Sequence, residues 1–274
     1  EGADFGDVLK DAQRLGYAEA EPSLDVDGHD AAHKIGILAS LAHGFWVNQK
    51  DIHVEGIRAV TKLDIQFAAQ LGYTIKLLGI VKKVEAESAS PKSKGKNGAQ
   101  VQVSVYPTLV PDAHVLASVN DVFNAVFVRG DIVGDTLFYG RGAGKDATAS
   151  AVLSDIADAA LDLHHGSESR VPPFVPHERN GAVLPIEQSV SRYYVRLSVM
   201  DEPGVIAKVT AILQKAGISI ASLIQPEGHQ GDVVPLVLMI HAAPFSAMDK
   251  ALKEIEKLKT VKAPPVMFRV ETFA

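Results

Sequence analysis

The chain contains no cysteine among its 274 residues. This absence excludes disulfide bonds, zinc–thiolate sites, iron–sulfur clusters and cysteine nucleophiles. An excess of positive charge is also missing, because 27 lysines and arginines stand against 33 aspartates and glutamates and the net charge is −6. A protein that binds nucleic acid through a broad surface usually carries a basic field. We therefore expect no nucleic-acid partner.

The chain also lacks a long hydrophobic run. Uninterrupted apolar stretches stay below the roughly 18 residues that a membrane-spanning helix needs, so we expect no membrane partner. Residues 1–5 have neither the basic nor the apolar region of a signal peptide, and the absence of cysteine fits a cytoplasmic location. The first residue is Glu1 rather than Met, and we expect the chain to be part of a longer gene product.

What is present is an ordinary globular composition, with 47% hydrophobic and 22% charged residues. The length predicts two domains. A proline-rich stretch with few periodic apolar positions covers 164–188, which is typical of a linker. We expect a first domain over 1–165, a linker over 166–190 and a second domain over 191–274.

Both domains mix helix and strand periodicity. In the first domain, apolar spacing predicts helices over 5–15, 31–41, 61–70 and 148–163, and strands over 74–86, 99–107, 124–128 and 136–140. A polar, lysine-bearing stretch over 88–98 predicts a solvated hairpin loop, with phosphate binding as the alternative. The first domain is thus expected to be α+β with a mixed sheet. In the second, strands over 193–200, 218–226, 233–241 and 266–270 alternate with helices over 204–216 and 246–258, which is the βαββαβ ferredoxin-like order.

The densest polar cluster lies just before the helix over 31–41. Five carboxylates fall within residues 19–30, and Asp30 and Lys34 share one helix face, with the acid N-terminal to the base. Carboxylates that complement a helix dipole are one interpretation. The other is a site that binds a small amino acid and moves a proton, because the following helix is apolar enough to be buried and would hold Lys34 at a cavity wall.

Two further features have weak signals. Gly140-x-Gly142-x-Gly144 precedes a helix, and it is either a flexible loop or a place where a dinucleotide approaches a helix N-terminus. His29 and His33 stand four apart, which is a zinc-ligand spacing, but no third ligand is indicated and we expect no metal site. The single tryptophan, Trp46, is expected in the core or at an interface.

The cluster at Gly16-Tyr-x-Glu-x-x-Pro-x-x-Asp-x-x-Gly-x-Asp-x-x-x-Lys34 resembles the catalytic signature of the homoserine dehydrogenase family. The resemblance continues in order through 39–42, 54–57, 71–78, 106–111, 122–126 and 139–144, and it spans nearly all of 1–163. It implies reversible, NAD- or NADP-dependent oxidation of L-homoserine to L-aspartate 4-semialdehyde in the biosynthesis of threonine, methionine and isoleucine.

The resemblance also implies roles for the residues of the signature. Lys34 would be the general acid and base at the terminal oxygen of the substrate. Glu19 would bind homoserine, through its ammonium group, and Tyr17 would line the pocket. Asp25 and Asp30 would position Lys34 and the substrate.

On the cofactor side, the resemblance implies contacts from Gly142, Ala143, Gly144 and Thr148. The chain departs from the family in one respect, because Gly-x-Gly-x-x-Gly, the fingerprint of a Rossmann dinucleotide-binding domain, is absent from its sequence. We expect that domain, a second catalytic lysine and a monovalent-cation site outside these residues. We therefore expect the 274 residues alone to have little or no activity.

The second domain resembles an ACT domain, a regulatory module that pairs side by side and binds amino acids. Its characteristic first loop is Asp201-x-Pro-Gly-Val. Asp201, Gly204, Val205 and Ile206 are then candidate effector-binding residues, with 218–222 opposite them. The implied effector is L-threonine and the implied assembly is a homodimer or homotetramer. Two alternatives stay open: an ACT domain that only dimerises, and a chain that is a non-catalytic amino-acid-binding and dimerisation module.

Overall fold

The computed structural model describes residues 5–14, 21–84, 99–142, 144–167 and 181–273. Its first part contains five helices, α1 (Phe5–Arg14), α2 (Ser23–Val26), α3 (His29–His43), α4 (Lys62–Gln70) and α5 (Lys145–His165). The strands of this part are β1 (His53–Val54), β2 (Tyr73–Lys83), β3 (Ala99–Pro111), β4 (Phe123–Gly130) and β5 (Gly134–Arg141). Two 3-10 helices, η1 (Gln49–Asp51) and η2 (Val115–Ser118), complete it.

The second part begins with a short strand, β6 (Gly181–Val183), and a 3-10 helix, η3 (Ile186–Gln188). A β-α-β-β-α-β unit follows as β7 (Val190–Met200), α6 (Val205–Lys215), β8 (Ile220–Ile224), β9 (Val233–Pro244), α7 (Phe245–Glu256) and β10 (Val266–Val270). Its strand order is β10-β7-β9-β8, which is the ferredoxin-like arrangement. The expected α+β class and the expected order of the second domain are confirmed.

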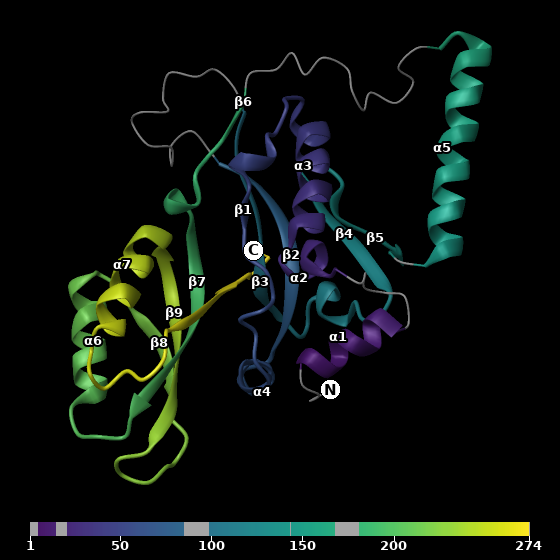
Figure 1. Cartoon of the computed structure of the whole chain (residues 1–274). Helices are drawn as coiled ribbons and strands as arrows, with labels where there is room; N and C mark the ends of the chain where they lie inside the picture. Colours follow the sequence, from purple (N-terminus) through teal and green to yellow (C-terminus); the bar gives the residue numbers. More distant parts are fainter. Residues whose placement is uncertain (1–4, 15–20, 85–98, 143, 168–180, 274) are drawn as a thin grey trace.

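One eight-stranded sheet runs through both parts (Figure 1). β2 pairs antiparallel along one edge of β3, from Tyr73–Pro111 to Lys83–Val101. Along the other edge of β3, β6, β1 and β10 pair parallel one after another. Because β10 also pairs antiparallel with β7, the last strand of the chain joins the sheets of the two parts.

The second part of the sheet is covered on both faces. Side chains alternate along β7, so Tyr193, Val195, Leu197 and Val199 pack in the core beneath α6 and α7. Tyr194 points to the opposite face and packs with Phe67 and Ala68 of α4 in a separate core. A sheet with two covered faces explains why the neighbouring strand β9 is apolar at nearly every position from Val233 to Ile240. The helix that covers the second face belongs to the first part of the chain.

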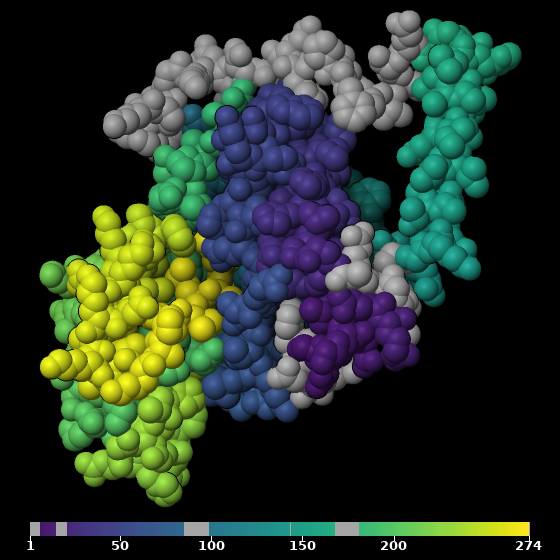
Figure 2. Space-filling view, viewed as in Figure 1, coloured from purple at the N-terminus to yellow at the C-terminus, as the bar shows by residue number. Residues whose placement is uncertain are grey.

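The remaining pair of strands, β4 and β5, forms a separate antiparallel ribbon. The strands stay paired up to Gly130 and Gly134, so the turn between them lies at residues 131–133. Gly134 has a φ of 75°, which glycine adopts without the steric cost of a Cβ. After β5, α5 stands apart from the body of the molecule (Figures 1 and 2).

Residues 164–188 differ in part from the expected linker. His164 and His165 form the last turn of α5, and β6 pairs with β3 through residues 181–183. The backbone N–H of Leu184 donates to the carbonyl oxygen of Val101 at 2.8 Å. The expected linker residues 168–180 lie outside the described residues.

Among the residues that the structure describes, no helix is both long enough and apolar enough to cross a membrane.

Candidate functional site

The candidate proton-transfer pair lies in the first two turns of α3. The helix begins after Gly28, whose φ of 81° turns the chain sharply out of α2. Asp30 and Lys34 follow at a four-residue spacing, and Lys34 Nζ lies 2.5 Å from Asp30 Oδ2. The carboxylate therefore fixes the direction of the lysine side chain. The lysine is not buried in a cavity wall as expected, since 61% of its side chain is exposed.

α3 itself is only half buried. Ala32, Gly36 and Ala39 face the sheet, and Gly79 of β2 allows close packing because a Cβ there would lie 3.0 Å from the Cβ of Ile35. The opposite face of the helix exposes large apolar side chains, namely Ile37, Leu38 and Leu41. Trp46, which follows the helix, is 65% exposed and is not in the core. The expectation of a fully buried helix is therefore wrong for the chain by itself.

The acidic segment before α3 forms the short helix α2, which sequence periodicity is too brief to predict. Asp25 lies on this helix with an exposed side chain. Asp27, at its C-terminal end, accepts hydrogen bonds from Arg58 Nε at 2.5 Å and Arg58 Nη2 at 3.1 Å. The hydrogen bonds from Arg58 lower the pKa of Asp27. We call residues 23–30, which comprise α2 and the turn into α3, the catalytic loop, after the role that the family resemblance implies for Asp30 and Lys34.

Three expected site residues, Tyr17, Glu19 and Ala143, lie outside the described residues. On the cofactor side, the structure places Gly142 directly after β5 and Gly144 directly before α5. A Cβ at Gly142 would lie 1.7 Å from Asn124 Nδ2, so a larger residue would not fit there. Gly144 has a φ of 115° and open space where a Cβ would be.

Thr148 is exposed in the second turn of α5. Gly144 is the N-cap residue of this helix, and its position supplies no side chain to satisfy the first N–H groups. An uncapped helix start behind two glycines fits the close approach of a phosphate or a dinucleotide. The residues present are therefore compatible with the expected cofactor side of the site.

The candidate effector loop, residues 201–204, follows directly after β7. Asp201 Oδ1 accepts a hydrogen bond from Gln225 Nε2 at 3.1 Å, so the loop and the end of β8 lie together. Gly204 has a φ of 85° and precedes α6. Ile206 is exposed, whereas the side chain of Val205 is buried in the core beneath the helix and cannot line the loop. The buried position explains Val205 as a packing residue at the start of the helix.

Two ion-pair networks between the parts were not predicted from the sequence. In the first, Arg269 of β10 is 1% exposed and its Nη1 donates to Glu55 Oε1 at 2.9 Å. Burial opposes the ionisation of Glu55, but hydrogen bonds from His53 and Arg269 outweigh it and lower its pKa. In addition, Lys82 Nζ of β2 lies 2.7 Å from Glu271 Oε1.

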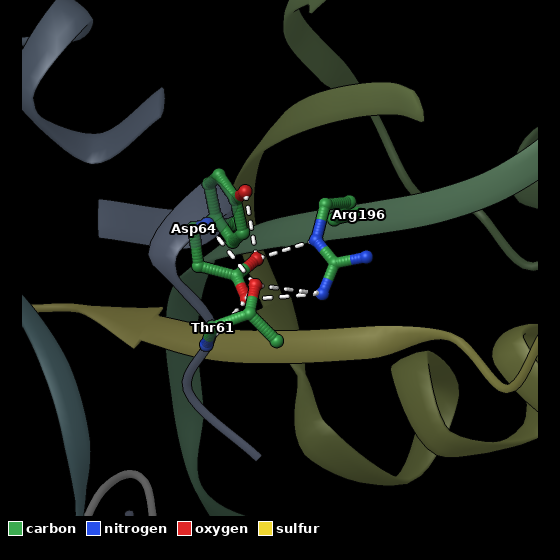
Figure 3. A network of polar contacts seen from close by, with 4 residues as sticks. Thr61, Asp64 and Arg196 are labelled. Carbon is green, nitrogen blue, oxygen red and sulfur yellow. Dashed lines mark hydrogen bonds and ion pairs between the residues drawn. The ribbon is translucent and has the colours of Figure 1, made fainter. Parts of the chain in front are cut away.

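The second network surrounds Asp64, whose side chain is completely buried (Figure 3). Arg196 donates from Nε to Oδ1 at 2.6 Å and from Nη2 to Oδ2 at 3.0 Å, and Tyr194 Oη donates to Oδ1 at 3.0 Å. Thr61 Oγ1 donates to Oδ2 at 2.6 Å in the capping box of α4. Burial raises the pKa of Asp64, but these donors outweigh it and the net shift is downward.

A sequence signal for this network exists in retrospect. Thr61 and Asp64 have the spacing of a helix-capping box, and Arg196 is a charged residue between the apolar Val195 and Leu197 of a strand. Neither signal identifies the partner, which is 132 residues away.

An open groove of about 560 Å3 lies between the two parts. Asp27, Glu55 and Arg58 line one side of it, and Asp249 and Lys253 of α7 line the other. Within the described ranges, no three side chains of His, Cys, Asp or Glu gather as metal ligands.

Comparison with known proteins gives matches over most of the chain. Residues 1–157 match the family described as "Homoserine dehydrogenase", and residues 193–259 match the family described as "ACT domain". Among curated relatives, the chain is 42% identical to "Homoserine dehydrogenase" of Pseudomonas aeruginosa, over 98% of this chain and 60% of that protein. It is 40% identical to "Homoserine dehydrogenase" of Corynebacterium glutamicum, over 98% of this chain and 58% of that protein.

Solved structures give the same result. A homoserine dehydrogenase from Thiobacillus denitrificans is 39% identical with a TM-score of 0.86, over 100% of this chain and 60% of that one. Homoserine dehydrogenase of S. aureus is 34% identical with a TM-score of 0.67, over 98% of this chain and 60% of that one. The chain therefore spans about three fifths of the length of these relatives.

Proposed function

Because this chain belongs to the homoserine dehydrogenase family, we propose that it forms the substrate-binding and proton-transferring part of an NAD(P)-dependent enzyme. The proposed reaction interconverts L-homoserine and L-aspartate 4-semialdehyde in the biosynthesis of threonine, methionine and isoleucine. The observation that carries the proposal is the ion pair between Lys34 and Asp30 at the start of α3. A lysine held in one direction by a carboxylate suits proton transfer at a single substrate oxygen.

In this proposal Lys34 takes the hydroxyl proton when homoserine is oxidised, and it returns a proton to the same oxygen in the reverse direction. Asp30 holds the side-chain nitrogen of Lys34 in place, at 2.5 Å. The neutral amine accepts the proton in the oxidation, and the resulting ammonium group donates it in the reverse direction. Asp25 lies on the adjacent helix with an exposed carboxylate that helps to position lysine and substrate. Glu19 binds the substrate ammonium group and Tyr17 lines the pocket. The negative charge of the carboxylate cluster suits the ammonium group of an amino-acid substrate.

NAD or NADP, when bound, accepts or supplies the hydride. Gly142, Ala143, Gly144 and Thr148 are the residues of this chain that we assign to the cofactor side. The absence of Gly-x-Gly-x-x-Gly from the sequence leads us to propose that the 274 residues alone turn over little or no substrate. Hydride transfer requires cofactor and substrate to be held together. Substantial turnover by the isolated chain would contradict this part of the proposal.

The catalytic assignment is tested with Lys34→Ala in the full-length enzyme. Removing the proton donor should lower kcat by two orders of magnitude or more, since general acid–base catalysis contributes about 10²–10⁴-fold. Lys50→Ala is the matched control, because Lys50 is an exposed lysine of the same part whose side chain lies outside the α3 ion pair. A loss below about tenfold for Lys34→Ala, roughly 1.4 kcal/mol in the barrier, would refute the assignment.

For the second part we propose an ACT regulatory domain that binds L-threonine as a feedback inhibitor. The loop at 201–204, held against Gln225, is the supporting feature. Gly204→Ala should weaken threonine binding measured by calorimetry, because an L side chain is strained at its φ of 85° and the loop would have to change its backbone conformation to relieve that strain. Gly217→Ala is the control, since Gly217 also has a positive φ and open space but lies at the far end of α6.

We also propose that the protein works as a homodimer or homotetramer. The exposed apolar side chains of α3, together with Trp46, offer a surface for a second copy. β8 is the last strand of the sheet and has an unpaired edge along its outer side in the described structure. Ile37→Lys should shift the sedimentation coefficient towards the monomer if the α3 surface is the contact. An unchanged assembly would exclude that surface.

A non-catalytic amino-acid-binding and dimerisation module is the second candidate, because the chain carries an ACT match and lacks the dinucleotide fingerprint. Calorimetry with L-homoserine distinguishes the two. Homoserine binding that is lost with Glu19→Gln supports a substrate site. Binding of threonine alone favours the module.

A further inference from the structure

We propose that residues 55–64 act as a connecting segment that couples the ACT part to the catalytic loop, with the Asp64–Arg196 ion pair as its anchor. The proposal rests on the proposed function only in naming 23–30 as catalytic and 201–204 as effector-binding. The coupling itself is a statement about two ends of one short segment. One end is fixed to the ACT part, and the other is fixed to the catalytic loop and, through the ion pair of Glu55 with Arg269, to β10 as well.

The first end is anchored in the ACT part. The Asp64 side chain is completely buried, and its carboxylate accepts hydrogen bonds from Nε and Nη2 of Arg196 and from the hydroxyl of Tyr194 (Figure 3). A buried carboxylate that loses its partner leaves a charge in a medium that solvates it poorly. The start of α4 must therefore follow β7 when that strand moves.

The second end is fixed to the catalytic loop. Arg58 binds Asp27 through two hydrogen bonds, and the backbone N–H of Ile57 donates to the carbonyl oxygen of Val26 at 2.9 Å. Gly56 packs so closely that a Cβ would lie 2.4 Å from the carbonyl oxygen of Val26. These contacts hold the loop between Asp25 and Asp30. Arg58 is thus assigned as a positioning residue for the loop.

The anchor is also close to the candidate effector loop. Arg196 lies on β7 five residues before Asp201, which follows the end of that strand, and β7 is paired along both edges, with β10 and β9. A strand paired on both edges moves as a unit with its sheet rather than bending by itself. A change at residues 201–204 would therefore reach Arg196, Asp64, Arg58 and the catalytic loop in that order.

Not every contact between the parts can serve this role. Lys82 and Glu271 also form an ion pair between the two parts, but it joins β2 to the residue after β10 and does not involve the connecting segment. The Glu271 side chain is only 9% exposed, so Lys82→Gln also leaves a buried carboxylate without its charged partner. This pair provides a matched control for breaking an ion pair between the parts.

Hydrogen exchange of the full-length protein tests the coupling without any ligand. Arg196→Lys keeps the positive charge and removes the paired hydrogen bonds that the guanidinium makes to the two oxygens of Asp64. The double variant Asp64→Asn with Arg196→Gln removes both charges, so that no unpaired charge is buried if the single variant folds poorly. Both variants should increase exchange at 23–30 and 55–61 by at least fivefold. Lys82→Gln should leave these amides unchanged.

A second measurement addresses regulation. In the full-length enzyme, Arg196→Lys and the double variant should raise the threonine concentration for half-inhibition by at least fivefold and change uninhibited kcat by less than twofold. If exchange at 23–30 does not rise in either of these two variants, or rises equally in Lys82→Gln, the coupling is refuted. If threonine has no effect on the unmodified enzyme, the effector assignment fails, and the exchange result alone decides the coupling.

Discussion

Tyr194→Phe isolates one hydrogen bond of the buried Asp64 network. The substitution removes the hydroxyl that donates to Asp64 Oδ1 at 3.0 Å and keeps the ring, which stacks on Phe268 at a centroid distance of 5.8 Å. Arg196 Nε still donates to the same oxygen, so the carboxylate is not left without a partner. No buried polar group is orphaned and no cavity the size of a side chain forms.

The expected cost follows from that geometry. A hydrogen bond to a charged group contributes about 1.5–3 kcal/mol, and we expect the free energy of unfolding to fall by about 2 kcal/mol. Urea unfolding followed by circular dichroism and by the fluorescence of the single tryptophan measures it. Tyr139→Phe is the control, because Tyr139 is 54% exposed and should cost less than about 0.5 kcal/mol.

The cost should also depend on pH. The network lowers the pKa of Asp64, so its contribution is fully present above the unfolded value of about 3.9 and is lost as the pH falls below it. The difference between Tyr194→Phe and the unmodified protein should therefore shrink in acid. A difference below about 0.5 kcal/mol at neutral pH, or one that grows as the pH falls, would refute the assignment of a charged, hydrogen-bonded Asp64.

Three further predictions concern the packing and charge of the same structure. Gly56→Ala should destabilise the protein by about 1–3 kcal/mol in urea unfolding, since its Cβ would meet backbone atoms, whereas Gly140→Ala, with open space, should be nearly neutral. Leu236→Ala in the completely buried ACT core should cost about 2–5 kcal/mol by the same assay, and a smaller loss would mean that the core collapses around it. Glu55→Gln should flatten the fall in thermal stability below about pH 4, because the folded protein holds the pKa of Glu55 below its ordinary value; an unchanged profile would contradict that shift.

The local elements and their order followed from the sequence. The apolar spacing over 31–41 predicted α3, which extends from His29 to His43, and the second domain showed its six elements in order. The four-residue spacing of Asp30 and Lys34 predicted their contact, because residues four apart share a helix face. Such features depend on neighbours within a few residues, and the chain therefore displays them directly.

The association of the two parts of the molecule could not be predicted from the sequence. The sequence indicated a linker before residue 190, and the structure shows one sheet that continues from β3 through β10 into β7. The sequence also did not predict that one face of α3 is exposed, because a helix covered on two sides and a helix covered on one side can have the same apolar pattern. Periodicity reports that a side chain is apolar, and it does not report which surface covers it.

By itself, then, the sequence determined the longer helices and strands, the family resemblance and the pairing of Lys34 with Asp30. Only the tertiary structure decided that Asp64 meets Arg196, that Arg269 is buried beside Glu55 and that α4 covers the second face of the ACT sheet. These contacts join residues more than a hundred positions apart. Their partners are selected by the path of the whole backbone, which brings each buried charge to the one opposite charge that can compensate the cost of its burial.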